Sequence, residues 1–257
     1  MTRAFSLVEL SIVLVILGLL TGGILAGQSL IRAAELRSVT TEYQKHIAAF
    51  NTFRDKYFAL PGDMTNATAF WTAQHATPAT CAALITAATG TATCNGDGNG
   101  QIADPSTHTY ETHRAWQHLA NAGLIEGSYS GVTTSGVGNT FGPTIGVNTP
   151  ASKLSNSGYT VRRYPAYDAA EPLYFAGGYG NLLWFGTANA SYTSTPVLKT
   201  EEAWNIDTKL DDGRPAFGRI LVPKNIGACI TSTTAATSEY NLIDTGARCP
   251  LMLLLGM

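Results

Sequence analysis

The hydrophobic and polar positions of this chain divide it near residue 31. From Leu10 to Ile31 no side chain is charged, and a helix of about 20 such residues is long enough to cross the hydrocarbon core of a bilayer. We expect this stretch to be a membrane segment. Because only eight residues precede Glu9, nearly the whole protein would then lie on one side of the membrane.

The apolar pattern continues beyond this segment with helical spacing. Between Leu36 and Tyr57, apolar or aromatic side chains recur every three or four residues, and most charged side chains fall at other positions. The pattern predicts one helix from about Ser6 to about Tyr57, roughly 75 Å long at 1.5 Å per residue. The segment from Leu60 to Asp63 should end it, because it contains a Pro and a Gly.

The remainder of the chain predicts shorter elements. Helices are expected at 111–122 and 200–210, and short β-branched or aromatic runs predict strands at 159–164, 172–176, 181–185, 217–222, 229–230 and 251–255. The order of these elements predicts an α+β fold, loop-rich, with a long amino-terminal helix packed on an antiparallel sheet. His108, His113 and His118 are spaced five apart and share no helix face, so we expect surface or cap histidines.

Composition favours a domain outside the cytosol. Charged residues make up 13% of the 257, the net charge is −2, and small polar residues are abundant. No basic stretch with interleaved aromatics occurs, so nucleic-acid binding has no support from the sequence. The motifs GxSxG, HExxH and the Walker loop are also missing, and we expect no enzyme activity.

Four cysteines fall in two local pairs, which are Cys81 with Cys94 and Cys229 with Cys249. On the oxidising side of a membrane these pairs read most simply as two disulfides, although four cysteines allow three connectivities. A zinc site is the alternative, but neither pair has the CxxC spacing.

Two interpretations of the first thirty residues compete. A secretory signal peptide has an apolar region of about 7–15 residues, which is shorter than the run here, although Gly22, Gly23, Ala26 and Gly27 could mimic a cleavage site. A plain single-pass anchor leaves Glu9 unexplained, because a carboxylate near hydrocarbon costs on the order of 2–4 kcal/mol and is normally paired or functional.

The segment Ala4-Phe5-Ser6-Leu7-Val8-Glu9-Leu10, after a short leader with one basic residue, resembles the processing site of type IV pilins and type II secretion pseudopilins. The resemblance implies that a prepilin peptidase cuts between Ala4 and Phe5, and that Phe5 is then N-methylated. The family usually has Gly before the cut, whereas this chain has Ala4, so we expect processing at lower efficiency.

The resemblance also implies how the chain is organised. Residues 1–4 would be a leader, 5–31 the transmembrane and assembly half of the helix, and 32–257 a periplasmic or extracellular pilin-like domain. Glu9 would meet the methylated amino terminus of a neighbouring subunit and set the register between subunits, since a paired buried charge is tolerated and an unpaired one is not.

The function implied is that of a structural subunit, with its size favouring a minor pilin or pseudopilin. It would be anchored in the bacterial inner membrane and assembled into a periplasmic or extracellular filament. Its partners would be the prepilin peptidase, other pilin subunits, the inner-membrane assembly platform and membrane lipid. The alternative is a single-pass anchored binding or adhesion domain that does not polymerise.

One further stretch carries candidate chemistry. Oxygen-bearing side chains alternate at Asn95, Asp97 and Asn99, Gly100 follows, and the backbone carbonyl of Gln101 occupies the next ligand position. This is the first half of an EF-hand-type calcium loop. The acid expected at its twelfth position is missing, so Asp104 or Glu111 would have to replace it. The alternative is an Asn/Asp/Gly turn without a metal.

Overall fold

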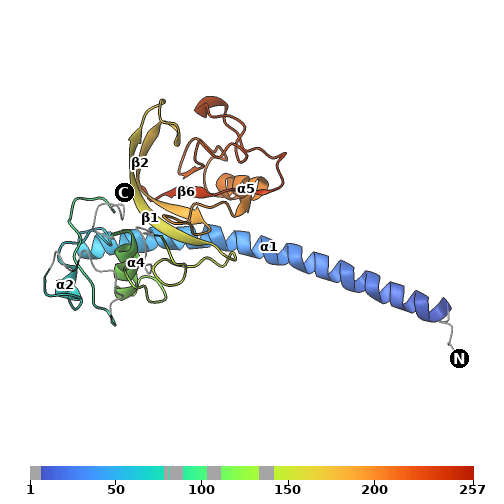
Figure 1. Cartoon of the computed structure of the whole chain (residues 1–257), viewed down its shortest axis with the longest axis horizontal. Coiled ribbons are helices and arrows are strands. Elements are labelled where there is room, and N and C mark those ends of the chain that lie inside the picture. Colours follow the sequence, from blue (N-terminus) through green and yellow to red (C-terminus); the bar gives the residue numbers. More distant parts are fainter. Residues whose placement is uncertain (1–6, 78–80, 82–88, 103–110, 133–141) are drawn as a thin grey trace.

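The computed structural model describes residues 7–77, 81, 89–102, 111–132 and 142–257. A long helix, α1 (Leu7–Tyr57), projects from a head that contains all the other elements (Figure 1). The helices of the head are α2 (Ala67–Phe70), α4 (Glu111–Asn121), α5 (Thr200–Leu210) and the 3-10 turn η2 (Ala235–Thr237). Its strands are β1 (Gly158–Tyr167), β2 (Gly177–Gly186), β3 (Leu198–Lys199), β4 (Ile220–Leu221), β5 (Ala247–Cys249) and β6 (Leu251–Leu254).

The second half of α1 forms the spine of the head. Val39, Tyr43, Phe50 and Phe53 are buried on the face that the periodicity predicted. Tyr43 also donates a hydrogen bond from its hydroxyl to Leu254 O at 2.7 Å, which ties the helix to the last strand. The predicted single helix is confirmed over its described residues, and the chain turns sharply after it, where Gly62 has a φ of +89°.

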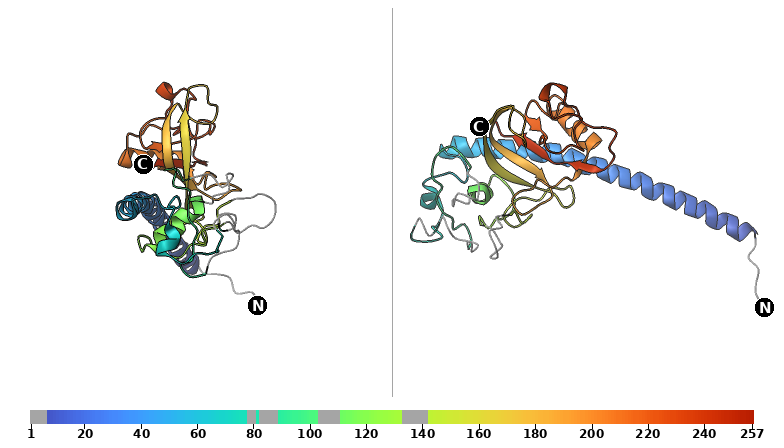
Figure 2. Two further views of the ribbon diagram at one scale, coloured as in Figure 1. Left: turned by 90° about the vertical axis from the view of Figure 1, so that its left-hand side faces the viewer. Right: turned by 45° about the horizontal axis from the view of Figure 1, so that its top comes forward.

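The main sheet has the strand order β1-β2-β6-β4, and every pair is antiparallel. Figure 2 shows it stacked over the second half of α1. Alternate side chains face opposite ways, so Leu183 and Phe185 join the core that includes α1, whereas Leu182 and Trp184 belong to a second cluster on the outer face. The predicted α+β architecture is therefore confirmed.

Two predicted strands are wrong in detail. Residues 172–176 lie in the connection between β1 and β2, where Leu173 O accepts a hydrogen bond from Lys224 N at 2.9 Å instead of a ladder bond. Residues 229–230 contribute one isolated bridge, between Ile230 and Tyr240. Both segments contain aromatic or β-branched residues, but short turns interrupt the backbone and prevent a regular strand.

Both predicted disulfides are present, Cys81–Cys94 and Cys229–Cys249. The Cys229–Cys249 disulfide joins residues that are 20 positions apart in the sequence. In the chain-entropy model, closing a loop of this length stabilises a fold by about 3 kcal/mol. It ties β5 back to the segment after β4.

The expectation of surface histidines is wrong for His113 and His118, which are completely buried. His118 Nδ1 accepts a hydrogen bond from Gly62 N at 3.0 Å and so links α4 to the turn after α1. Burial lowers the pKa of His118 to about 3. His108 lies outside the described residues.

His46 on α1 is a third buried histidine. Its ring packs edge-on against Trp116 and Tyr159, with centroids 5.1 and 4.7 Å away. Neither ring nitrogen has a hydrogen-bond partner among the described residues. Burial therefore lowers the pKa of His46 to about 4, because nothing in this apolar site compensates the charged form.

Replacing His46 should flatten the pH dependence of stability. The unfolded chain binds a proton at this side chain near pH 6.5 and the folded chain only near pH 4, so His46 lowers the free energy of unfolding as the pH falls through that window. Between pH 6.5 and 4.5, His46 accounts for a decrease of about 2 kcal/mol in the free energy of unfolding. In His46→Leu this decrease should be absent, as measured by denaturant titrations at the two pH values. His75→Gln, at an exposed histidine, is the control; an unchanged pH slope in His46→Leu would contradict the assignment.

Candidate functional site

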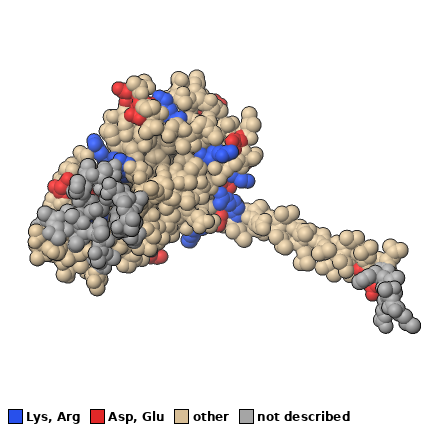
Figure 3. Space-filling model, viewed as in Figure 1, with Lys and Arg blue, Asp and Glu red and all other residues tan. Residues whose placement is uncertain are grey.

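The first half of α1 is the largest exposed apolar surface of the described chain. Its side chains extend into open space, with Leu7 86% and Leu19 72% exposed. This is the one described helix long and apolar enough to cross a membrane, although a signal sequence near the amino terminus meets the same criterion. Figure 3 shows a long stretch of helix without charged atoms between the head and the helix tip.

Glu9 lies in the first turn of α1, next to this apolar surface. The cleavage residues Ala4 and Phe5 fall outside the described residues. Ser11 and Thr21 direct their hydroxyls back to carbonyls of their own helix, at 2.9 Å from Val8 O and Leu17 O. Glu9 is the single ionisable side chain between Leu7 and Ile31.

An ion pair marks the boundary between the exposed and the packed half of α1. Arg32 donates to both carboxylate oxygens of Glu202 on α5, at 2.7 and 2.6 Å. Glu202 also accepts from Lys199 N at the start of α5. Burial acts to raise the pKa of Glu202, but the bonds from Arg32 and Lys199 outweigh it and hold the pKa below its usual value. The pair fixes α5 to α1 just where the apolar run ends.

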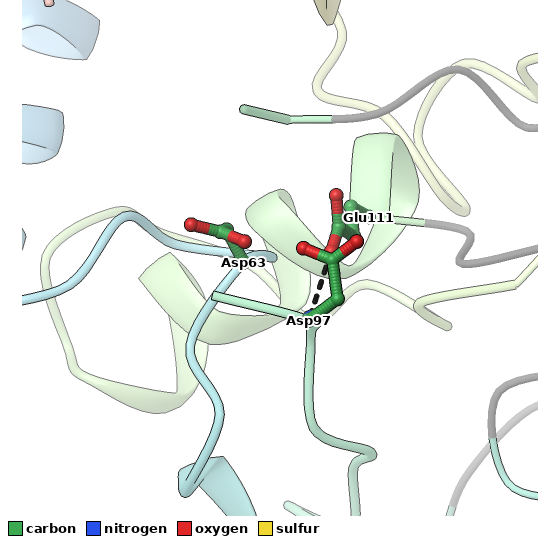
Figure 4. Close-up of side chains that lie close together, drawn as sticks. All are labelled: Asp63, Asp97 and Glu111. Atoms are coloured by element: carbon green, nitrogen blue, oxygen red, sulfur yellow. Dashed lines mark hydrogen bonds between the residues drawn. The ribbon is translucent and has the colours of Figure 1, made fainter. Parts of the chain in front are cut away.

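The loop predicted to bind calcium contributes to a cluster of three carboxylates, which Figure 4 shows in close-up. One oxygen each from Asp63, Asp97 and Glu111 lies within 4.8 Å of the other two. Ca²⁺ binds oxygen ligands at 2.3–2.6 Å, so ligands on opposite sides of one ion are about 5 Å apart. The spacing of the three carboxylates therefore fits a single calcium ion.

Three different segments supply these carboxylates. Asp63 comes from the turn after α1, Asp97 from the Asn95–Gln101 loop, and Glu111 from the first turn of α4. Asp63 accepts hydrogen bonds from Asn99 N and Gly100 N, both at 2.9 Å, and Asp97 N donates to Glu111 Oε1 at 3.1 Å. Backbone amides thus hold two of the acids in place.

Charge concentrates at this cluster. Asp63 and Glu111 are almost completely buried, while Asp97 is exposed. The pKa of Asp63 is raised to about 6, because burial, together with the hydrogen bond to Asp97, outweighs the hydrogen bonds from the loop amides. A divalent cation would relieve the repulsion between these acids.

The side-chain oxygens of the other predicted ligands accept hydrogen bonds from backbone amides. Asn95 Oδ1 accepts from Thr68 N in α2 at 2.9 Å, which ties the loop to that helix. Within the loop, Asn99 Oδ1 accepts from Gln101 N at 2.8 Å, and Asp97 Oδ1 accepts from Asn99 N at 3.0 Å. These last two bonds form the short turns that Asn and Asp favour. The loop therefore combines the turn conformation with a carboxylate cluster, and the two interpretations do not exclude each other.

Sequence reasoning missed Asp63, because it treated the Leu60–Asp63 segment only as the end of a helix. The loop reaches this turn through Gly96, where a Cβ atom would overlap the backbone of Gly62 and Asp63. The contact between these two glycine-containing turns brings Asp63 to the loop, and it cannot be predicted from a single sequence.

A second acidic group lies near α5. Asp207, Asp211 and Asp212 also bring one oxygen each within 4.8 Å of the others. Burial raises the pKa of Asp207 to about 7. Asp207 accepts from the Tyr240 hydroxyl at 2.8 Å, and Asp211 accepts from Arg219 N and Ile220 N, so these acids organise the surrounding turns.

No protein-family model, curated protein or solved structure matches this chain.

Calcium should stabilise the full chain through the Asp63–Asp97–Glu111 cluster. With a Kd of about 10⁻⁴–10⁻³ M, Ca²⁺ at about 1 mM raises the free energy of unfolding by about 0.4–1.4 kcal/mol and raises Tm by about 1–6 °C. The rise should be larger at pH 7.5 than at pH 5, because Asp63 must lose its proton before it binds a cation. Differential scanning fluorimetry measures it.

The control for this prediction is Asp212→Asn, in the other acidic group, which should keep the calcium effect. Asp97→Asn and Asp63→Asn should each abolish it. A Tm that does not respond to Ca²⁺, or one that responds equally in Asp97→Asn, would rule out the site.

Proposed function

We propose that the chain is a structural subunit, a minor pilin or pseudopilin, that a prepilin peptidase processes and that assembles into a filament of the type IV pilus or type II secretion class. The observation that carries the proposal is the continuity of α1. One helix exposes an apolar half over Leu7–Ile31 and builds the core of the head with its other half. An ordinary anchor needs no such rigid connection between its membrane segment and its domain.

The rigid connection supports assembly for a physical reason. Apolar side chains that face outward around a whole helix must be covered by lipid before assembly, or by other helices after it. The same helix can pass from one environment to the other without a change in the head. The Arg32–Glu202 ion pair holds the head in a fixed orientation at the point where the covered segment would begin.

The processing motif supports the same proposal. Cleavage between Ala4 and Phe5 would place a new amino terminus four residues before Glu9. In an apolar bundle of helices, that amine on one subunit and the Glu9 carboxylate of another neutralise each other. The two disulfides agree with an oxidising compartment outside the cytosol. The other partners in this proposal are the inner-membrane assembly platform and membrane lipid.

The Glu9→Ala variant should lose filament incorporation but keep its exported head. Removing one member of a buried charge pair costs about 3–5 kcal/mol, which corresponds to a loss of well over 10-fold in assembly. The measurement compares the amount of chain in sheared filaments with the amount in membranes. Disulfide formation in the membrane fraction reports the folded head.

Two matched variants make the result specific. Glu9→Gln keeps the shape but removes the charge, and should fail as Glu9→Ala does. Ser11→Ala removes another polar group of the same segment, and should assemble normally, because Ser11 bonds only within its own helix. Normal incorporation of Glu9→Ala would falsify the role assigned to this acid. Co-purification with filament subunits separates the proposal from an anchored binding domain that does not polymerise.

A further inference from the structure

A polar cavity lies between α5 and the loop that the Cys229–Cys249 disulfide closes. Its volume is about 320 Å³, and Trp204, Arg214, Ser238, Glu239 and Tyr240 are among the residues that line it. Cavities of this size hold small organic ligands. It is separate from the carboxylate cluster of Asp63, because α5 packs near Arg32 whereas α2 and α4 lie at the far end of α1 (Figure 1).

The walls of this cavity are fixed by hydrogen bonds. The Tyr240 hydroxyl donates to Asp207 at 2.8 Å, and Gly213 N donates to the other oxygen of Asp207 at 3.2 Å. Across the disulfide-closed loop, Thr231 N donates to Glu239 O at 2.9 Å. A preformed cavity loses little conformational freedom when a ligand enters.

Several polar groups on these walls have unused hydrogen-bonding capacity. Ser238 is 1% exposed, and its hydroxyl has no hydrogen-bond partner among the described residues. Buried hydroxyls nearly always have one. The Arg214 guanidinium lies 4.4 Å above the Phe217 ring and makes one long bond, 3.5 Å, to Ala236 O. With the exposed carboxylate of Glu239, the cavity offers both donors and an acceptor.

The charge and the shape of the cavity narrow the class of ligand. Trp204 presents a flat aromatic surface that is 37% exposed. Of the lining residues, only Glu239 and Arg214 are charged, and their charges balance. The acidic group of Asp207, Asp211 and Asp212 lies behind the wall, because Asp207 accepts hydrogen bonds from Gly213 and Tyr240. This neighbouring negative charge disfavours phosphates and carboxylates and favours neutral or cationic ligands.

We propose that this cavity binds a saccharide and that it prefers an amino sugar to an acidic sugar. A pyranose ring has an apolar C–H face, which packs on an aromatic side chain such as Trp204, and a rim of hydroxyls that both donate and accept hydrogen bonds. Ser238 and Arg214 meet that rim, and Glu239 meets the ammonium group. This inference does not depend on filament assembly, and it gives the head a recognition role.

The test uses the full chain in phosphatidylcholine nanodiscs, because sugar-headed detergents would compete for the cavity. Glucosamine, glucose and glucuronate, which share one ring but differ in charge, are titrated by saturation-transfer NMR. Glucosamine should bind with a Kd on the order of 1 mM, glucose should bind several-fold more weakly, and glucuronate should show no saturable binding.

Variants locate the binding. Trp204→Ala should weaken glucosamine binding by about 10-fold or more, and Glu239→Gln should remove the preference for glucosamine over glucose. Phe58→Ala, which removes an even more exposed aromatic ring outside the cavity, should change neither. Unchanged melting temperatures confirm that each variant is folded.

Three results would overturn the proposal. They are no saturable binding of glucosamine at about 50-fold the predicted Kd, equal binding by Trp204→Ala and the wild type, and glucuronate that binds as tightly as glucosamine. Each can occur whether or not Glu9 variants assemble. Failure of the saccharide proposal is therefore distinguishable from failure of the filament proposal.

Discussion

One constraint shapes this molecule: a single helix carries two apolar surfaces that need different partners. The surface over Val39–Phe53 is buried by the sheet and by α4, within the same chain. The surface over Leu7–Ile31 is not covered by any described residue, and its burial must come from lipid or from other helices. Everything else in the fold positions the head relative to this helix.

The head is attached to α1 through contacts at both ends of its packed half. Arg32 pairs with Glu202 at the beginning, and the turn after Tyr57 is fixed by the bond between Gly62 and His118 at the end. The carboxylates of Asp63, Asp97 and Glu111 lie next to this second attachment. A bound cation there would join the end of α1 to α4 and to the disulfide-linked loop, so it would stiffen the part of the head most distant from the exposed apolar half of α1.

The sequence predicted the features that depend on local pattern or on a small number of choices. Helix α1 could be predicted because its apolar pattern, which recurs every three to four residues, is regular over a long stretch. The disulfides could be predicted because the cysteines fall in two close pairs. The place of Asp63 in the carboxylate cluster and the burial of the histidines could not be predicted from local pattern. Their surroundings come from segments 30 or more residues apart that meet only in the folded chain, as Gly62 meets His118 across a separation of 56.

The chemistry of the mature amino terminus tests the central claim most directly, because it separates a processed filament subunit from a permanently anchored or secreted domain. Intact and fragment mass spectrometry of the chain purified from membranes measures it. We predict a chain that begins at Phe5 and carries one methyl group on its amino nitrogen. A chain that retains Met1, or one that begins near Ala26, would contradict the filament role and leave α1 as an ordinary anchor or a cleaved signal.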